Sequence, residues 1–312
     1  MTTAGHLPVK MESAQIEKTI SEYLKTESLE FLGAGDFCSA YLVNNEWVFR
    51  FAKHDEARRS LQREFCLLPK IAGRITLEIP FPELASFDRE PSFIAYRLLP
   101  DNSLAPELYL RLDETKRAKC ALQVAAFLNQ FHSIEIETAQ NCGVKTCDFR
   151  SKYQRVLSAT KKRLFPLLPE PGQDFIEQVM AEYLAADDDY RPALLHGDLS
   201  PDHVLFDAKT GSVSGIIDFG DMMIGDPARD LLWIYEDYGL DFLARLWPVF
   251  HVADKQRSLE RLFQYSMLEI FDWTLRSQQN DRTQLKICLI ELEKMRRERE
   301  KRFDELLSAC LA

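Results

Sequence analysis

The sequence predicts an α+β protein with two lobes: a small mixed lobe with an antiparallel sheet, then a larger, mostly helical lobe. The chain has 312 residues, which is too long for one average core. Its first hundred residues have the pattern of strands, a glycine turn and one helix, whereas amphipathic helical patterns dominate after Pro100. We therefore expect an N-terminal lobe over 1–98 and a C-terminal lobe over 99–312.

The spacing of apolar residues changes along the first hundred residues and predicts the elements of the small lobe. Residues 12–25 carry apolar side chains at helical spacing and predict a short helix. The segments LEFLGAG, SAYLV and WVFRF then predict three strands, with Asn44-Asn45 as a tight turn between the last two. A helix over 55–71, the extended segment IPFPELASF and the strand SFIAYRLL complete the lobe.

The large lobe is predicted to be helical around two loop-and-strand segments, LLHGDLSPDHVLFD and SVSGIIDFGD. Asp226 has the character of an N-cap, with Pro227 at the first helical position. We expect helices over 113–132, most of 148–190, from Pro227 through about Asp237, and from about 281 to 308.

Composition excludes several classes of protein. The formal net charge of −10 repels nucleic acid and anionic membranes, so we expect neither as a partner. The start lacks the apolar run of a signal peptide, and no uncharged stretch reaches the length of a membrane helix. Seven scattered cysteines without a CxxC pair indicate reduced thiols, not a disulfide framework or a zinc site. We expect a cytoplasmic monomer.

Two acidic motifs carry the chemistry. The segment HGDLSPDH contains Asp198, and IDFGD follows with Asp218 twenty positions later. Phosphoryl transfer to an alcohol needs a carboxylate that orients the hydroxyl and accepts its proton, and ligands for the magnesium that bridges the phosphates. We predict Asp198 as the catalytic base and Asp218 as the principal Mg²⁺ ligand.

HGDxxxxH followed by IDFGD resembles the phosphotransferase family of aminoglycoside and choline kinases, which are relatives of protein kinases. The order of motifs over residues 30–240 is most similar to aminoglycoside 2″-phosphotransferases. The resemblance implies a protein-kinase-like fold, ATP or GTP as donor, and antibiotic resistance by phosphorylation of an aminoglycoside. A choline, macrolide or sugar kinase remains the alternative, and a catalytically inactive nucleotide-binding module is a third.

One position departs from the family pattern. The second metal ligand is usually Asn, and this sequence has His203 there, as the resembled 2″-type enzymes also do. Imidazole is a less natural magnesium ligand than an oxygen donor. His203 is therefore predicted as a metal ligand, with packing within the loop as the alternative. We expect His196 to be architectural.

The glycine turn LGAGDFC predicts a phosphate-binding loop that contains Gly33, Gly35 and Asp36, since glycines let backbone N–H groups approach phosphate. Cys38 stands where a dinucleotide-binding motif needs a third glycine, and a strand follows instead of a helix. The sequence therefore does not favour a dinucleotide-binding motif at this turn.

The kinase pattern also needs a cation on the third strand, paired with a glutamate on the following helix. Strand alternation favours Arg50 over its rival Lys53, and Glu64 is the natural partner. The nucleotide base should lie at the lobe crossover, with Tyr96 behind it and the backbone of Arg97 and Leu99 along its edge. The choice between ATP and GTP stays open.

The acceptor is predicted to be a small cation bound by the C-terminal lobe. Only six residues separate Gly220 from Pro227, too few for the segment with which a protein kinase holds a peptide. Asp230 is predicted to support the catalytic loop. Carboxylates suit the ammonium groups of an aminoglycoside, although each could instead be a solvated charge. The candidates are Asp221, Glu236, Asp237, Glu269 and Asp272.

Overall fold

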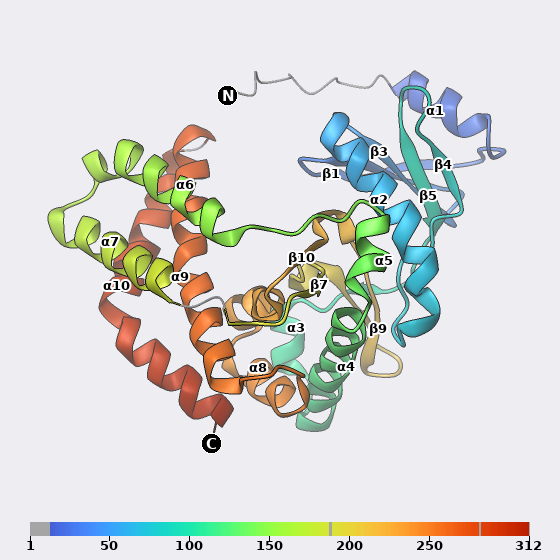
Figure 1. Cartoon of the computed structure of the whole chain (residues 1–312). Coiled ribbons are helices and arrows are strands. Elements are labelled where there is room, and N and C mark those ends of the chain that lie inside the picture. The colour runs from blue at the N-terminus through green and yellow to red at the C-terminus, as the bar shows by residue number, and fades with distance from the viewer. Residues whose placement is uncertain (1–12, 187–188, 281, 312) are drawn as a thin grey trace. The chain divides into compact units, whose positions relative to one another are not determined.

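The computed structural model describes residues 13–186, 189–280 and 282–311 (Figure 1). They form two compact units, between which the chain passes several times. The predicted α+β class is confirmed, while the functional division at residue 98 stays a prediction. Unit 1 holds the chain up to Ala105 with Ile134–Val144 and Asp202–Met222, and unit 2 holds Pro106–Ser133, Lys145–Pro201 and the chain from Met223 onward.

Unit 1 is built around a five-stranded antiparallel sheet with the order β1-β2-β3-β5-β4. Asn44 and Asn45 have φ angles of 54° and 53°, so the predicted tight turn between β2 and β3 is confirmed. Asparagine tolerates this left-handed region better than most residues do. The strands are β1 (Leu29–Ala34), β2 (Cys38–Val43), β3 (Trp47–Ala52), β4 (Leu84–Ser86) and β5 (Phe93–Arg97).

The central strand β3 is buried along its whole length, because a helix covers each face of the sheet. Phe49 and Phe51 pack in a cluster that includes side chains of α1 (Ser13–Ser21). Alternate residues point to the other face, where Ala52 packs with α2 (Asp55–Ile71). The alternation therefore directs Arg50 toward α2.

The rest of unit 1 combines the end of its first segment with two segments that return to it from later in the chain. A three-stranded sheet has the order β6-β8-β9. Its strands are β6 (Asn102–Ser103), β8 (Val204–Asp207) and β9 (Ser212–Ile216), and the short helices are η1 (Ala72–Arg74), α5 (Ile136–Asn141) and η4 (Phe219–Asp221), with η3 (Pro201–His203) at the junction of the units.

A disulfide joins α2 to the end of α5 within unit 1. Cys66 and Cys142 are bonded with a Cα–Cα distance of 5.4 Å, and the Lys70 Nζ lies 3.2 Å and 3.1 Å from their sulfur atoms. The expectation of reduced thiols is therefore wrong for this pair. The two cysteines lie 76 residues apart in sequence, so no local spacing pointed to their pairing.

Unit 2 is mostly helical and contains one two-stranded sheet of β7 (Ala193–Leu195) and β10 (Met223–Gly225). Helices α6, α7, α9 and α10 pack together, and α4 packs on α8 (Figure 1). Within the described residues, no helix is both long enough and apolar enough to cross a membrane. The helices are α3 (Pro106–Arg111), α4 (Glu114–His132), α6 (Phe149–Arg163), η2 (Phe165–Leu167), α7 (Glu170–Ala185), α8 (Leu240–Leu246), η7 (Trp247–Val249), α9 (Lys255–Asn280) and α10 (Arg282–Leu311).

The segment after Asp226 differs from the single helix that the sequence predicts. Asp226 does cap it, accepting a bond from the Ala228 backbone N–H at 3.1 Å. The chain then forms a 3₁₀ helix, η5 (Pro227–Leu231), and a π-helical turn, η6 (Ile234–Tyr238). Apolar spacing cannot separate these tighter and wider turns from an α-helix, and the prediction of one continuous helix is wrong.

Candidate active site

Arg50 links two acidic side chains in unit 1. Its Nη1 donates to Glu64 Oε2 at 2.5 Å, and its Nη2 donates to Asp218 Oδ1 at 2.8 Å. The pair that the sequence predicts between β3 and α2 is therefore present, and it continues to the aspartate of the IDFGD motif. Ser60, also on α2, donates to the Gly220 carbonyl at 2.7 Å and ties the same motif to the helix.

The electrostatics of this chain of charges are set by burial. Burial raises the pKa of Glu64 to about 7, against the opposing charge of Arg50. The Glu64 Oε1 is buried without a hydrogen-bond partner among the described residues. Burial alone would lower the pKa of Arg50, but the charges of Glu64 and Asp218 raise it well above its usual value. Arg50 is thus a fixed cation at this position.

Asp218 and His203 lie together, as the prediction of a metal site requires. The distance from His203 Nε2 to Asp218 Oδ2 is 3.6 Å. Asp218 has a φ of 62°, an uncommon conformation for a residue other than glycine and one that occurs at functional sites. In the described part of the chain, no group of three or more His, Cys, Asp or Glu side chains gathers as for a metal held by protein alone.

The glycine turn joins β1 to β2, where the Gly35 N–H donates to the Cys38 carbonyl at 3.0 Å. Asp36 is exposed beside it. Lys53 donates its ammonium group to the Gly35 carbonyl. The two rival cations therefore lie in different places: Lys53 is tied to the glycine turn, whereas Arg50 is tied to α2. Gly33 lies in β1 just before this turn, beside a register shift of the strand.

The predicted base-binding stretch follows β5. Tyr96 is buried, and burial raises the pKa of its phenol. The Arg97 guanidinium stacks on Trp47, 4.0 Å from the ring centroid, and pairs with Glu83 at 3.6 Å. Leu99 is half-buried. The side chain of Arg97 is engaged along the sheet, so only its backbone suits the predicted role.

In unit 2, Asp230 anchors the loop that carries Asp198. Asp230 Oδ2 accepts from the His196 backbone N–H and from His132 Nε2, both at 2.9 Å, and Oδ1 accepts from the Gly197 N–H at 2.8 Å. Burial alone would raise the pKa of Asp230, but these hydrogen bonds, that of His132 first, lower it. The predicted support of the loop by Asp230 is confirmed, and Asp198 lies half-buried just after these anchors.

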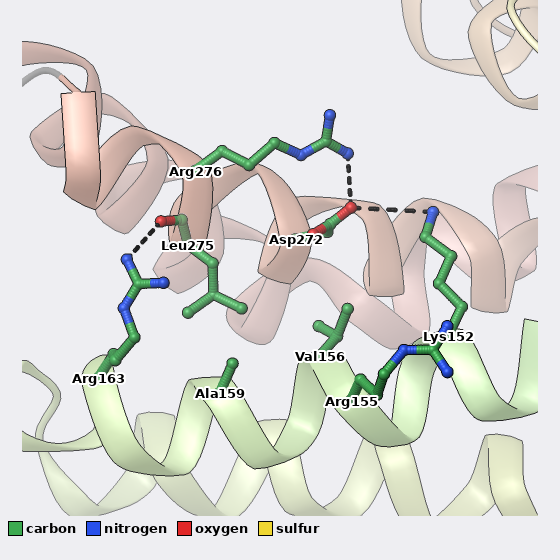
Figure 2. Close-up of a pocket in the computed structure, with 8 residues that line it drawn as sticks. All are labelled: Lys152, Arg155, Val156, Ala159, Arg163, Asp272, Leu275 and Arg276. Atoms are coloured by element: carbon green, nitrogen blue, oxygen red, sulfur yellow. Dashed lines mark hydrogen bonds and ion pairs between the residues drawn. The ribbon is translucent and has the colours of Figure 1, made fainter. Parts of the chain in front are cut away.

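The predicted acceptor carboxylates of unit 2 are mostly paired with cations. Glu236, in the π-helical turn, pairs with Arg302 at 3.0 Å, while Asp237 beside it is exposed. On α9, Asp272 pairs with Arg276 and lies 3.8 Å from Lys152 (Figure 2). Asp221, exposed in unit 1, belongs to η4.

Glu269 has the most partners of these carboxylates. It lies 3.1 Å from Arg229, 3.5 Å from Lys152 and 3.3 Å from Arg276. Burial alone would raise the pKa of Glu269, but these three cations, that of Arg229 first, hold it below its usual value. The negative charge of Glu269 is therefore favoured by cations that already surround it.

Sequence reasoning missed the residues that position others. These are Ser60, which holds Gly220, His132, which holds Asp230, and the cations Lys152 and Arg229, which hold Glu269. Each lies far from its partner in sequence, so no motif spacing joined them. The pair of Arg50 and Glu64 was predicted because the kinase pattern requires a cation and a glutamate at these places, and strand alternation favoured Arg50 over Lys53.

The chain is similar to known phosphotransferases. Viomycin phosphotransferase from Streptomyces vinaceus is 34% identical over 106 residues, which are 33% of this chain and 37% of that protein. The solved GDP complex of wild-type aminoglycoside 2′-phosphotransferase-IIIa superposes with a TM-score of 0.83 at 28% identity, over 92% of this chain and 98% of that one. The GDP and kanamycin complex of APH(2″)-IIIa gives 0.84 at 28% identity, over 90% and 97%.

The matched region contains every motif described above. The model of the phosphotransferase enzyme family matches residues 32–262, which run from the glycine turn through HGD and IDFGD into α9. Because this match covers well over half of the chain, and the kinase-like fold is shared with the solved enzymes, the chain belongs to the phosphotransferase enzyme family.

Proposed function

We propose that this protein is an aminoglycoside O-phosphotransferase that moves the γ-phosphoryl group of ATP or GTP to a hydroxyl of the drug and so confers antibiotic resistance. One observation carries the proposal. Over nearly its whole length the chain resembles, at 28% identity, an enzyme whose solved complex contains GDP and kanamycin. The motifs with Asp198 and Asp218 lie within that shared region.

The proposed reaction assigns the proton transfer to Asp198. Its carboxylate orients the acceptor hydroxyl and accepts the proton as the oxygen bonds to the γ-phosphorus. The bond from that phosphorus to the bridging oxygen breaks, and the nucleoside diphosphate leaves. The bonds that hold His196 and Gly197 to Asp230 support this assignment, because they restrict the loop that carries the base.

Arg50 is our choice over Lys53 for the phosphate-binding cation. Its guanidinium lies beside the half-exposed carboxylate of Asp218, and its remaining N–H groups can donate to phosphate oxygens. The turn with Gly33, Gly35 and Asp36 would cover the phosphates, and Glu64 would hold Arg50. The crossover residues Tyr96, Arg97 and Leu99 would enclose the base.

Asp218 and His203 are the proposed ligands of Mg²⁺. The pair fits, since the Asp218 carboxylate and the His203 imidazole lie close enough to contact one ion, and phosphate oxygens and water would supply the other ligands that magnesium prefers. When bound, Mg²⁺ neutralises charge on the β- and γ-phosphates. The residues themselves orient the metal-binding oxygen through the bond from Arg50 to Asp218 Oδ1.

The proposed acceptor site uses Asp221, Glu236, Asp237, Glu269 and Asp272. The ammonium groups of an aminoglycoside would replace the arginines and the lysine that now pair with Glu236, Glu269 and Asp272. That existing compensation favours a second candidate, a small-molecule kinase for an acceptor with fewer charges, such as choline, a macrolide or a sugar.

We also propose that the protein acts as a monomer in the cytoplasm, where ATP and GTP are supplied, and that it has no nucleic acid or membrane partner.

The test is a panel of acceptors with purified protein, MgATP or MgGTP. We expect diphosphate release and a phosphorylated product with at least one of kanamycin, gentamicin and streptomycin. Asp198→Asn should abolish the transfer and leave nucleotide affinity within about twofold, which separates catalysis from a contaminating kinase. Turnover of choline, a macrolide or a sugar alone would replace the aminoglycoside assignment by the second candidate.

A further inference from the structure

We propose that Cys66, Cys142 and Lys70 of unit 1 form a thiol–disulfide exchange site that takes a dithiol, and that Lys70 speeds the exchange. The disulfide joins α2 to the residue that follows α5. Glu64, which holds Arg50, lies on the same helix as Cys66, so the exchange acts on the helix that fixes this cation. The inference goes beyond the proposed function, and no step of it involves phosphoryl transfer.

The position of Lys70 is the first argument. Its Nζ lies 3.2 Å from the Cys66 Sγ and 3.1 Å from the Cys142 Sγ. Cys66 and Lys70 are four positions apart on α2, a spacing that places two side chains on one face of a helix. No carboxylate of the described residues pairs with Lys70. Its positive charge is therefore available to either sulfur when that sulfur becomes a thiolate.

Exposure is the second argument, because it decides which sulfur is attacked. Lys70 is exposed and Cys66 is partly exposed, whereas Cys142 is only 6% exposed. A thiolate of the dithiol therefore attacks the Cys66 Sγ. A bond forms between these two sulfur atoms, the bond between Cys66 and Cys142 breaks, and Cys142 leaves with the electron pair as a thiolate.

The second thiol of the reagent completes the exchange. It loses its proton to water, as the first thiol did, and attacks the reagent sulfur that is bonded to Cys66, which leaves as a second thiolate. The dithiol is oxidised to a cyclic disulfide, and its two electrons reduce the protein disulfide. A thiolate departs faster when the pKa of its thiol is lower, and a neighbouring lysine lowers that pKa. Lys70 therefore assists both departures.

The proposed cytoplasmic location gives independent support. Thiols are kept reduced in the cytoplasm, and the disulfides that do form there are usually transient and either catalytic or redox-sensing. The other five cysteines of the chain are free. A dithiol therefore finds its one disulfide beside Lys70. This support depends on the proposed location, whereas the arguments from geometry and exposure do not.

The test is the rate at which dithiothreitol reduces the full chain after oxidation in air, followed by alkylation and mass spectrometry. Unfolded in denaturant before any reduction, the oxidised parent should be alkylated at its five free cysteines and not at the other two. Lys70→Met should slow the reduction about fivefold, because the leaving thiolates lose their cation. Lys70→Arg keeps the charge and should react within about twofold of the parent rate.

Lys18→Met is the matched control, since Lys18 is an exposed lysine of unit 1 on α1, across the sheet from α2. It should leave the rate unchanged. Glutathione, a monothiol that stops at the mixed disulfide, should be found on Cys66 once the released thiol is alkylated. Three results would each overturn the proposal: seven alkylated cysteines in the oxidised parent, equal rates for Lys70→Met and Lys18→Met, or glutathione on Cys142 in place of Cys66.

Discussion

Two buried carboxyl groups, one in each unit, show how hydrogen-bond donors decide what burial does to an acid. Glu64 is fully buried and Asp230 is 2% exposed. Glu64 has one donor, Arg50, and one oxygen without a partner among the described residues, and burial raises its pKa to about 7. Asp230 has three donors spread over both oxygens, and its pKa is lowered in spite of equal burial.

The comparison separates two kinds of anchor. Asp230 is a rigid anchor, because losing its charge would weaken the hydrogen bonds of two backbone N–H groups and of His132 at once. Glu64 is a weaker anchor. Its ionised form is costly to bury, but that form holds Arg50 in place. We therefore expect unit 2 to depend on its buried acid more than unit 1 does.

Asp230→Asn should have the largest effect. It removes the acceptor of His132 and forces an amide NH₂ toward backbone donors, at a cost of about 4 kcal/mol in the free energy of unfolding. Phosphoryl transfer should fall by about a hundredfold or more, because the loop with Asp198 loses its anchors. Urea unfolding and steady-state kinetics measure both. Asp241→Asn, a half-exposed acid of the same unit, should cost about 1 kcal/mol.

Cys142→Ser should come next. It removes the cross-link between α2 and the end of α5 and should lower the free energy of unfolding by about 3 kcal/mol under oxidising conditions. With a reductant present, the variant and the parent should unfold alike. Cys147→Ser, a change at a free cysteine nearby, should have no such redox-dependent effect. A parent protein indifferent to reductant would contradict the importance of this cross-link.

Glu64→Gln should cost less than Asp230→Asn, about 1 kcal/mol, because the amide keeps a hydrogen bond with Arg50 and avoids a buried charge. The KM for nucleotide should rise about tenfold while kcat changes less, as expected when Arg50 loses its fixed position. Glu56→Gln on the same helix removes only two partly exposed ion pairs, with Arg59 and Arg63, and serves as control. If Glu64→Gln destabilised the protein as much as Asp230→Asn, the comparison would fail.

The smallest effect concerns pH. The pKa of Glu64 is raised from an ordinary 4.5 to about 7, so its contribution to stability is complete at low pH and is lost as the pH rises through about 7. The pH dependence that Asp230 contributes has the opposite sign, because its contribution to stability is present above its ordinary pKa and is lost as the pH falls. Urea titrations from about pH 6 to about pH 7 should show the parent losing about 1 kcal/mol more than Glu64→Gln. Parallel curves would refute the sign for Glu64.

The sequence predicted what depends on local period and motif. The bounds of α2 and the Asn44-Asn45 turn follow from helix spacing and turn residues, and strand alternation selected Arg50 for the pair with Glu64 that the kinase pattern requires. Helix α4 likewise begins one residue from the predicted start. These features need no knowledge of tertiary contacts, because each residue's neighbours are set by the element that carries it.

Two features that the sequence did not predict depend on contacts between residues far apart in the chain. The cross-link from Cys66 to Cys142 and the cations around Glu269 join residues from separate elements. The 3₁₀ and π turns after Asp226 keep the apolar spacing of a helix, so the sequence pattern could not distinguish them. The roles of the nucleotide-site and acceptor residues stay predictions.

The segment DMMIGD between Gly220 and Pro227 has a consequence for control. It contains no serine, threonine or tyrosine, and its residues Met223–Gly225 form β10, already paired with β7. A cell therefore cannot switch this stretch by adding phosphate to a side-chain hydroxyl, as it does for many protein kinases. The rate of the reaction in a cell would then depend on the amount of enzyme made and on the supply of its substrates.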